Sequence, residues 1–164
     1  MNKPLSNQQI CKALNISEDD IILYKKLHQC DTIDDLFRDD LFKIILVETK
    51  AGFGHWVSLL KDRDTYIFFD SYGLAPDAEL RFVLPLNRLL LGEDHRELTR
   101  LLRGKKVIYN KVKFQGKESS TCGRYQVAWF DYFKMGYSLP EFQRFMKKHK
   151  TKSYDNLICH IVYI

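Results

Sequence analysis

The segment of this chain best suited to chemistry is a polar loop that ends in a cysteine. It reads FQGKESSTCG, from Phe114 to Gly123. The residues before it, Val107 to Phe114, are rich in β-branched and aromatic side chains, which is typical of a strand. The residues after it, Arg124 to Phe133, repeat apolar side chains at helical spacing. Cys122 therefore lies at a predicted strand–loop–helix junction, where free backbone N–H groups and the helix dipole favour the reactive thiolate.

A predicted hairpin supplies a base for this thiolate. Two apolar runs, Trp56 to Leu60 and Thr65 to Phe69, flank the charged turn Lys61 to Asp64. If that turn has four residues, Leu60 pairs with Thr65 and His55 lies directly opposite Asp70. Opposed residues share a face, with Cβ atoms about 4.5–5.5 Å apart, so the carboxylate can orient the imidazole. The prediction depends on the register, because a slip of one residue places the two side chains on opposite faces.

Gln115, seven residues before Cys122, adds a neutral hydrogen-bond donor. With Cys122 as nucleophile, His55 as base and Asp70 as acceptor, its amide would form an oxyanion hole together with the backbone N–H of Cys122. This combination of groups performs acyl transfer. Each residue alone has a plainer interpretation: a packed cysteine, a turn-forming aspartate, a polar strand end. Only the combination indicates catalysis.

The remaining pattern predicts the elements that position these residues. Phe42 to Glu48 and the C-terminal run Leu157 to Ile164 are predicted as two further strands. Helices are predicted from Ser6, within 16–27, around 78–83 with Pro85 as a breaker, over 93–102, and from Ser138 with Glu141 at the capping-box position. The strands neither alternate strictly with helices nor follow one another. We therefore predict an α+β fold with a mixed five-stranded sheet.

Length and composition limit the classes of protein. The 164 residues, of which 45% are hydrophobic, predict one domain spanning residues 1–164. No apolar window is long enough for a membrane span, so no membrane partner is expected. The N-terminus lacks the pattern of a secretory signal, so we expect free thiols in a reducing compartment. The four cysteines include no CxxC pair, and neither a disulfide framework nor a metal site is predicted.

Positive charge is concentrated towards the C-terminal end. Residues 101–164 carry 13 Lys/Arg against 4 Asp/Glu, whereas residues 1–100 carry 13 against 17. A basic face makes nucleic acid a candidate partner. Lysines that only keep a protein soluble give the same pattern, so this alternative stays open. The candidate DNA-binding residues are Lys105, Lys106, Lys111, Lys113, Lys147, Lys148 and Lys150.

The order His, Asp, Gln, Cys resembles that of the adenovirus-type (adenain) and SUMO-type cysteine proteases. The matching segments are GHW (Gly54 to Trp56), FFDSYG (Phe68 to Gly73) and FQGKESSTCG (Phe114 to Gly123). The Gln-to-Cys separation and the Tyr-Gly pair after the aspartate favour the adenain side. The resemblance implies a papain-like, circularly permuted fold with helices on both sides of the sheet. It implies catalytic roles for His55, Asp70, Gln115 and Cys122, and oxyanion or substrate-binding roles for Trp56 and Gly123.

The same resemblance implies a function. The chain is expected to be a cysteine endopeptidase of a double-stranded DNA virus or virus-like element that cleaves capsid or core precursors during virion maturation, after small residues such as Gly. It would act as a monomer in the virion and at nuclear or cytoplasmic assembly sites in the host cell. No cofactor is required for the chemistry, although DNA or an activating peptide could stimulate it, as in adenain. Two alternatives stay open: an isopeptidase for host ubiquitin-like conjugates, and a non-enzymatic DNA-binding module.

Two departures from adenain qualify this expectation. Asp70 stands where adenain has Glu, a substitution that the SUMO proteases share. The region Arg103 to Val112 lacks the cysteine through which adenain holds its activating peptide. A covalently attached peptide is therefore not expected here, and a non-covalent one remains open.

Overall fold

The centre of the molecule is a five-stranded mixed sheet in the order β1-β2-β3-β4-β5. The computed structural model describes residues 3–38 and 41–164. The strands are β1 (Ile21–Leu23), β2 (Phe42–Lys50), β3 (Phe53–Asp62), β4 (Thr65–Phe69) and β5 (Lys106–Tyr109). The three central strands are antiparallel, and each edge strand runs parallel to its neighbour. The predicted fold class is thereby confirmed.

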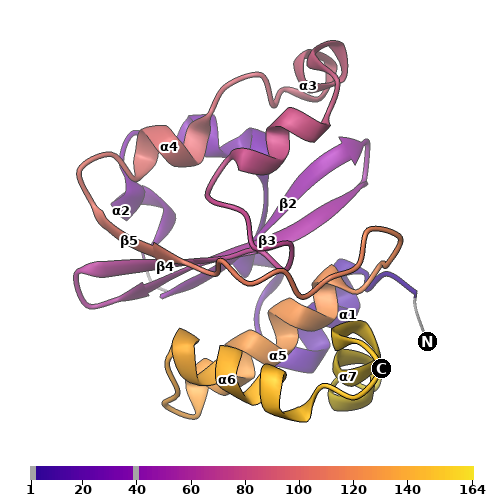
Figure 1. Cartoon of the computed structure of the whole chain (residues 1–164). Coiled ribbons are helices and arrows are strands. Elements are labelled where there is room, and N and C mark those ends of the chain that lie inside the picture. The colour runs from indigo at the N-terminus through magenta and orange to yellow at the C-terminus, as the bar shows by residue number, and fades with distance from the viewer. Residues whose placement is uncertain (1–2, 39–40) are drawn as a thin grey trace.

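Helices cover both faces of this sheet (Figure 1). One layer contains α1 (Asn7–Leu14), α5 (Cys122–Lys134), α6 (Leu139–His149) and α7 (Tyr154–Ile161). The opposite layer contains α2 (Ile33–Leu36), α3 (Pro85–Leu91) and α4 (Glu97–Leu101), with the 3-10 helices η2 (Tyr24–Gln29) and η3 (Ala78–Phe82). A further 3-10 helix, η1 (Glu18–Asp20), precedes β1. Among the described residues, the helices are too short or too polar to cross a bilayer.

Alternate residues of β3 supply the two hydrophobic cores. Trp56 and Leu60 enter the core formed with α1, α5, α6 and α7, whereas Val57 and Leu59 enter the opposite one. This alternation follows from the pleat of the strand. Trp129 of α5 is fully buried in the first core. Burial of each large apolar side chain stabilises the fold by about 1.5–3 kcal/mol, so α5 is held firmly against the sheet.

The elements on which the predicted site depends are found where the sequence places them. The predicted strands at 42–48, 56–60 and 65–69 lie in β2, β3 and β4. Ser6 and Ser138 cap α1 and α6 in capping boxes, the second of them with Glu141. The aromatic helix after the loop is α5, which starts at Cys122 itself.

The prediction of a strand at the C-terminus is wrong. Most of Leu157 to Ile164 lies in α7, which Ser153 caps by accepting from the backbone N–H of Asn156 at 3.0 Å. Ile158 within α7 and Val162 at its C-cap are both buried, and the backbone N–H of Val162 donates to the carbonyl oxygen of Ile158. A short continuous apolar run suits a buried helix as well as a buried strand. Here the segment is helical because it packs against α5.

Four further segments differ from the prediction. The strand predicted at 107–114 ends at Tyr109, where the side chain of Asn110 donates to the carbonyl oxygen of Asp70 at 2.7 Å and the chain leaves the sheet. The helix predicted within 16–27 is divided into η1, β1 and η2, because 21–23 pair with β2. The helix around 78–83 does end before Pro85, as predicted, but Pro85 then starts a helix that the pattern does not predict, α3, since the first helical position needs no N–H. The helix predicted over 93–102 is reduced to α4.

Candidate active site

Strands β3 and β4 separate towards one end of the sheet, and the start of α5 fills the gap. Their pairing ends at Ser58 and Phe69, although β3 begins five residues earlier, at Phe53. Gln126, fully buried on α5, donates from its side-chain amide to the carbonyl oxygen of Trp56 at 2.9 Å and to that of Phe69 at 3.3 Å. One side chain thus satisfies a backbone acceptor on each strand and fixes the helix start between them.

Cys122 is the first residue of α5 and is 6% exposed. The next residue, Gly123, allows the helix to approach its neighbours closely. A Cβ at this position would lie 3.1 Å from Cβ of Leu5 and 3.4 Å from Cδ1 of Trp56. The sulfur is thereby placed at the N-terminal end of a long helix, where the dipole and free backbone N–H groups favour a thiolate.

The predicted contact between His55 and Asp70 is present: Nε2 lies 2.9 Å from Oδ1. The register that produces it differs from the prediction. Asp62 pairs with Thr65, so the turn has two residues instead of four. Continuing this register sets His55 opposite Tyr72, and the two rings stack with centroids 4.7 Å apart. Because the error is two residues, it keeps both side chains on the same face, and Asp70 remains a diagonal neighbour.

His55 also hydrogen-bonds to Cys122, and each group shifts the pKa of the other. Burial lowers the pKa of His55, but the hydrogen bonds to Asp70 and Cys122 outweigh it and raise the pKa well above 6.5. Burial raises the pKa of Cys122, but the hydrogen bond and positive charge of His55 outweigh it and lower the pKa. Both shifts favour a thiolate–imidazolium pair. In contrast, burial raises the pKa of Cys11 and of Cys30.

The side-chain amide of Gln115 is held in a fixed orientation. Its Oε1 accepts from the hydroxyl of Ser71 at 2.6 Å, and its Nε2 donates to the carbonyl oxygen of Ser119 at 2.7 Å. An amide nitrogen carries two hydrogens, so a second one remains for a ligand oxygen. Gln115 and Cys122 line the same cavity.

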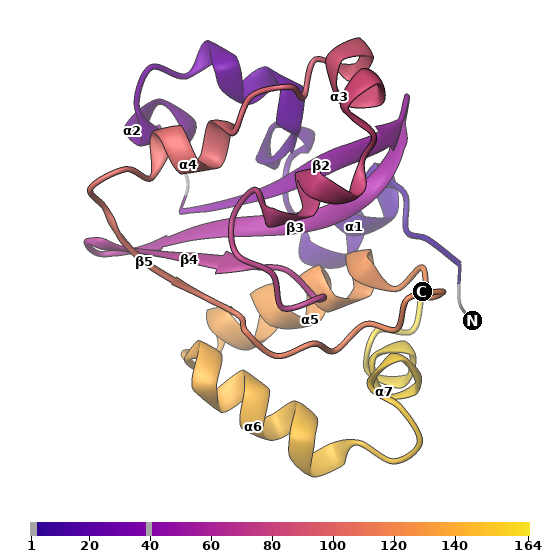
Figure 2. The same ribbon diagram turned by 45° about the horizontal axis from the view of Figure 1, so that its top comes forward.

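Asp155 of α7 anchors the loop that carries these groups. Its Oδ2 accepts from the backbone N–H of Gly116 at 2.9 Å. Its Oδ1 accepts from the hydroxyls of Ser119 at 2.8 Å, Thr121 at 2.5 Å and Tyr125 at 3.2 Å. Four donors on one carboxylate fix the loop between Gln115 and Cys122. Figure 2 shows this loop reaching the start of α5 after the chain leaves β5. No sequence pattern points to Asp155, which precedes the predicted C-terminal strand at 157–164.

Four of the predicted site residues line one cavity of about 640 Å³: His55, Trp56, Gln115 and Cys122. Trp56 is 5% exposed and its indole N–H donates to the carbonyl oxygen of Leu5 at 3.3 Å. The aliphatic and aromatic part of the cavity wall consists of Pro4, Val47, Phe53, Trp56, Leu74, Phe82, Val83 and the ring of Tyr72.

The seven candidate DNA-binding lysines are exposed and lie on separate elements. Lys105 and Lys106 are at the start of β5, Lys111 and Lys113 follow that strand, and Lys147, Lys148 and Lys150 are at the end of α6. Among these seven, Lys113 lines the cavity, which sets it beside Gln115. DNA binding stays a prediction.

A second carboxylate, Glu79 of η3, lies beside His55 and Asp70, and no sequence pattern pointed to it. The ligand atoms of these three residues fall within 4.8 Å of one another, and no second group of this kind occurs among the described residues. The proton that His55 Nε2 donates to Asp70 lies inside this group. We therefore interpret it as a proton-linked cluster and assign it no metal.

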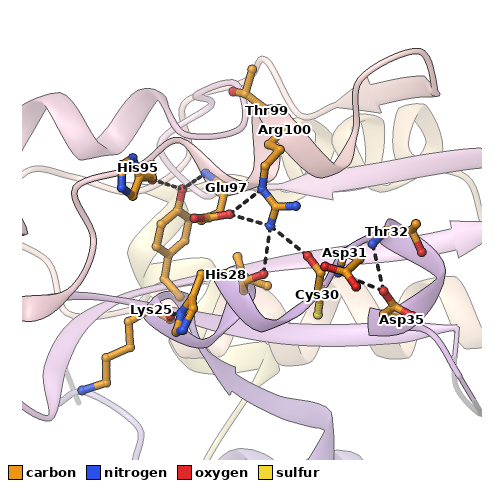
Figure 3. A network of polar contacts seen from close by, with 12 residues as sticks. Lys25, His28, Cys30, Asp31, Thr32, Asp35, His95, Glu97, Thr99 and Arg100 are labelled. Atoms are coloured by element: carbon orange, nitrogen blue, oxygen red, sulfur yellow. Dashed lines mark hydrogen bonds and ion pairs between the residues drawn. The ribbon is translucent and has the colours of Figure 1, made fainter.

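The segment that carries Glu79 is anchored to its own helical layer. The carboxylate of Asp77 accepts from the hydroxyl of Tyr24 at 2.5 Å and from a backbone N–H of α4 at 2.6 Å. Arg100 of α4 donates to the carbonyl oxygen of Cys30 at 2.9 Å, at the end of η2 (Figure 3). These contacts join η2, α4 and the start of η3, so the position of Glu79 is fixed from outside the cavity.

Comparison with known proteins places the chain in a viral context. No family model matches the sequence. The uncharacterized protein V9 of Sputnik virophage is 36% identical over 129 residues, which cover 75% of this chain and 73% of V9. The chain belongs to the V9 family. The V9-family chain also resembles the crystal structure of the pS273R protease of ASFV, with a TM-score of 0.55 and 15% identity over 100% of this chain and 70% of that one. At this identity the likeness establishes the fold, which is that of a viral protease.

Proposed function

We propose that this V9-family chain is a cysteine peptidase. The observation that carries the proposal is the arrangement of His55 between Asp70 and Cys122 at the start of α5, with the amide of Gln115 in the same cavity. Nucleophile, base, orienting acceptor and neutral donor are the parts that acyl transfer requires. The fold shared with the ASFV protease supports the same interpretation.

In the proposed mechanism, the Cys122 thiolate attacks the carbonyl carbon of the scissile peptide bond. The backbone N–H of Cys122 and Nε2 of Gln115 donate to the oxyanion that forms. His55, held through Nε2 by Asp70, gives its proton to the leaving amine, and the C–N bond breaks. Water then attacks the thioester, transfers a proton to His55 and releases the acid, which restores the thiolate.

The proposed substrates are structural precursor polypeptides of a virus, cleaved after small residues such as Gly during virion maturation. The virophage relative supports a viral role, and Trp56 beside Cys122 supports a narrow site. We further propose that the enzyme acts in the virion and at assembly sites, and that DNA stimulates it through the basic C-terminal third. The rival substrate class is ubiquitin-like conjugates.

A cleavage assay on the precursors encoded with this chain tests the proposal. The wild type should cleave them, Cys122→Ala should not, and the matched control Cys30→Ala should retain activity, because Cys30 lies outside the cavity. Cleavage by Cys122→Ala would refute the assignment of the nucleophile. Adduct formation at Cys122 with ubiquitin- or SUMO-based suicide probes, without precursor cleavage, would move the substrate to the rival class. Added DNA, with salt varied, tests stimulation in the same assay.

A further inference from the structure

Glu79 is a buried carboxylate with no role in the mechanism above. Its side chain is 8% exposed, and its Oε2 lies 3.7 Å from Nε2 of His55. This Oε2 and the Oδ2 of Asp70 are both buried, and within the described residues neither has a hydrogen-bond partner when both groups are treated as acceptors. Two buried oxygens of this kind are costly, because each has lost its water. One proton placed between the two carboxyl groups would satisfy both.

We propose that Glu79 is a positioning residue whose protonated carboxyl group donates a hydrogen bond to Asp70 and so holds Asp70 towards His55. This inference rests on the proposed function of the site. Asp70 is the ionised member of the pair, because it accepts from His55 Nε2 at 2.9 Å and from the backbone N–H of Tyr72 at 2.7 Å. Donors of this kind favour a carboxylate, whereas among the described residues no backbone N–H donates to the carboxyl group of Glu79.

The groups that face Glu79 shift its pKa in opposite directions. Burial and the negative charge of Asp70 raise the pKa of Glu79 well above 4.5, the positive charge of His55 on β3 lowers it, and Asp77 of the same segment raises it. The ring of Tyr72 stacks on the imidazole of His55. The net shift of the pKa is upward, so Glu79 stays neutral at pH values where an ordinary glutamate is ionised. A neutral carboxylic acid is a hydrogen-bond donor, which a carboxylate is not.

The anchoring of η3 is consistent with this role. Asp77 and α4 fix the segment from the outer layer, so the carboxyl group of Glu79 does not depend on substrate to reach the cluster. Asp70 then has a defined donor on each oxygen. The imidazole orientation, which sets the proton transfer to and from Cys122, depends on Asp70 being fixed in this way.

Carboxyl-selective ¹³C NMR of the full chain tests the protonation directly. In the Cys30→Ala background, which retains Cys122, the Glu79 carboxyl should titrate well above pH 4.5, and Asp70→Asn should move this titration to lower pH by removing the negative charge. The Glu79→Gln spectrum identifies the signal. Titration of Glu79 near the ordinary glutamate value would overturn the proposal.

The rate of alkylation of Cys122 by iodoacetamide at neutral pH tests the positioning role without any substrate. Glu79→Gln keeps a donor and should stay within about twofold of the parent, whereas Glu79→Leu should be about tenfold slower, the equivalent of one lost hydrogen bond to a charged group. The matched control Glu141→Leu removes a half-buried carboxyl group from the capping box of α6, in the opposite helical layer, and should leave the rate unchanged. Equal rates in both Glu79 variants would overturn the inference. Slow alkylation of Cys122 in the parent itself would instead count against the proposed function.

Discussion

Gln126 of α5 donates a hydrogen bond of 2.9 Å to the carbonyl oxygen of Trp56 on β3. Trp56 follows His55, and Gln126 lies one helical turn after Cys122. This bond therefore fixes the distance between the element that carries the base and the element that carries the nucleophile. The second bond of the same amide, to Phe69, ties in the strand that leads to Asp70. Gln126 is not a member of the candidate triad, but its side chain holds the elements that carry the triad in place.

Gln126→Leu should destabilise the fold by about 2–4 kcal/mol, because two buried carbonyl oxygens lose their donor. The measurement is urea unfolding, together with the alkylation rate of Cys122, which should also fall. Gln143→Leu serves as the control: it removes one bond, to Asn110, at a half-buried site and should cost about 0.5–1.5 kcal/mol. A loss for Gln126→Leu no larger than that of the control would contradict the prediction.

Gln115→Ala should lower kcat by about 10²–10³-fold, the effect of removing one oxyanion donor. KM should change little, since the donor acts on charge that develops in the transition state. The check is steady-state kinetics on a precursor peptide. Ser71→Ala, which removes the hydroxyl that orients the amide at 2.6 Å, should give a smaller loss in the same direction. An unchanged kcat in Gln115→Ala would exclude the donor role.

Asp70→Asn should shift the alkaline limit of activity to lower pH. Asp70 contributes to raising the pKa of His55, and its removal lets that pKa fall, so the imidazolium loses its proton at lower pH. The rate at neutral pH should fall by about 10²–10⁴-fold, the usual contribution of general acid–base catalysis. A pH profile of kcat/KM measures both effects. A shift of the alkaline limit to higher pH would contradict the prediction.

Asp155→Asn should destabilise the loop before α5, because the amide replaces one of two acceptor oxygens that together receive four donors. We expect a loss of about 1.5–3 kcal/mol in unfolding free energy and a lower kcat. Asp131→Asn, at an exposed ion pair with Lys134, is the matched control and should stay within about 1 kcal/mol. Thermal and urea unfolding of both variants decide between a loop anchor and an ordinary surface charge.

The sequence predicts the proximity of the candidate residues better than it predicts the elements around them. His55 and Asp70 were expected in contact, although the turn between their strands was read two residues too long. The contact survives that error because side chains alternate with a period of two. Cys122 and Gln115 were also expected near the junction where the structure has them, since the strand, loop and helix signals there are local.

The remaining parts depend on contacts that local patterns do not encode. The run at 157–164 is apolar throughout, so its helical state is decided by packing against α5. Glu79 lies nine residues after Asp70, in a separate 3-10 helix, and Asp155 lies 33 residues after Cys122. Neither residue differs locally from a surface acid. Gln126 lies on a predicted helix, but only the separation of β3 and β4 gives its amide two acceptors.

The anchoring of the loop by Asp155 also bears on the order in which the candidate site is completed. During synthesis, the segments that contain His55, Asp70 and Cys122 emerge before α7 does. Until residue 155 has left the ribosome, the N–H of Gly116 and the hydroxyls of Ser119 and Thr121 have no carboxylate to converge on. In a nascent chain, Cys122 therefore follows a loop that Asp155 does not yet anchor. The loop between Gln115 and Cys122 is therefore completed only after the segment that forms α7 has been synthesised.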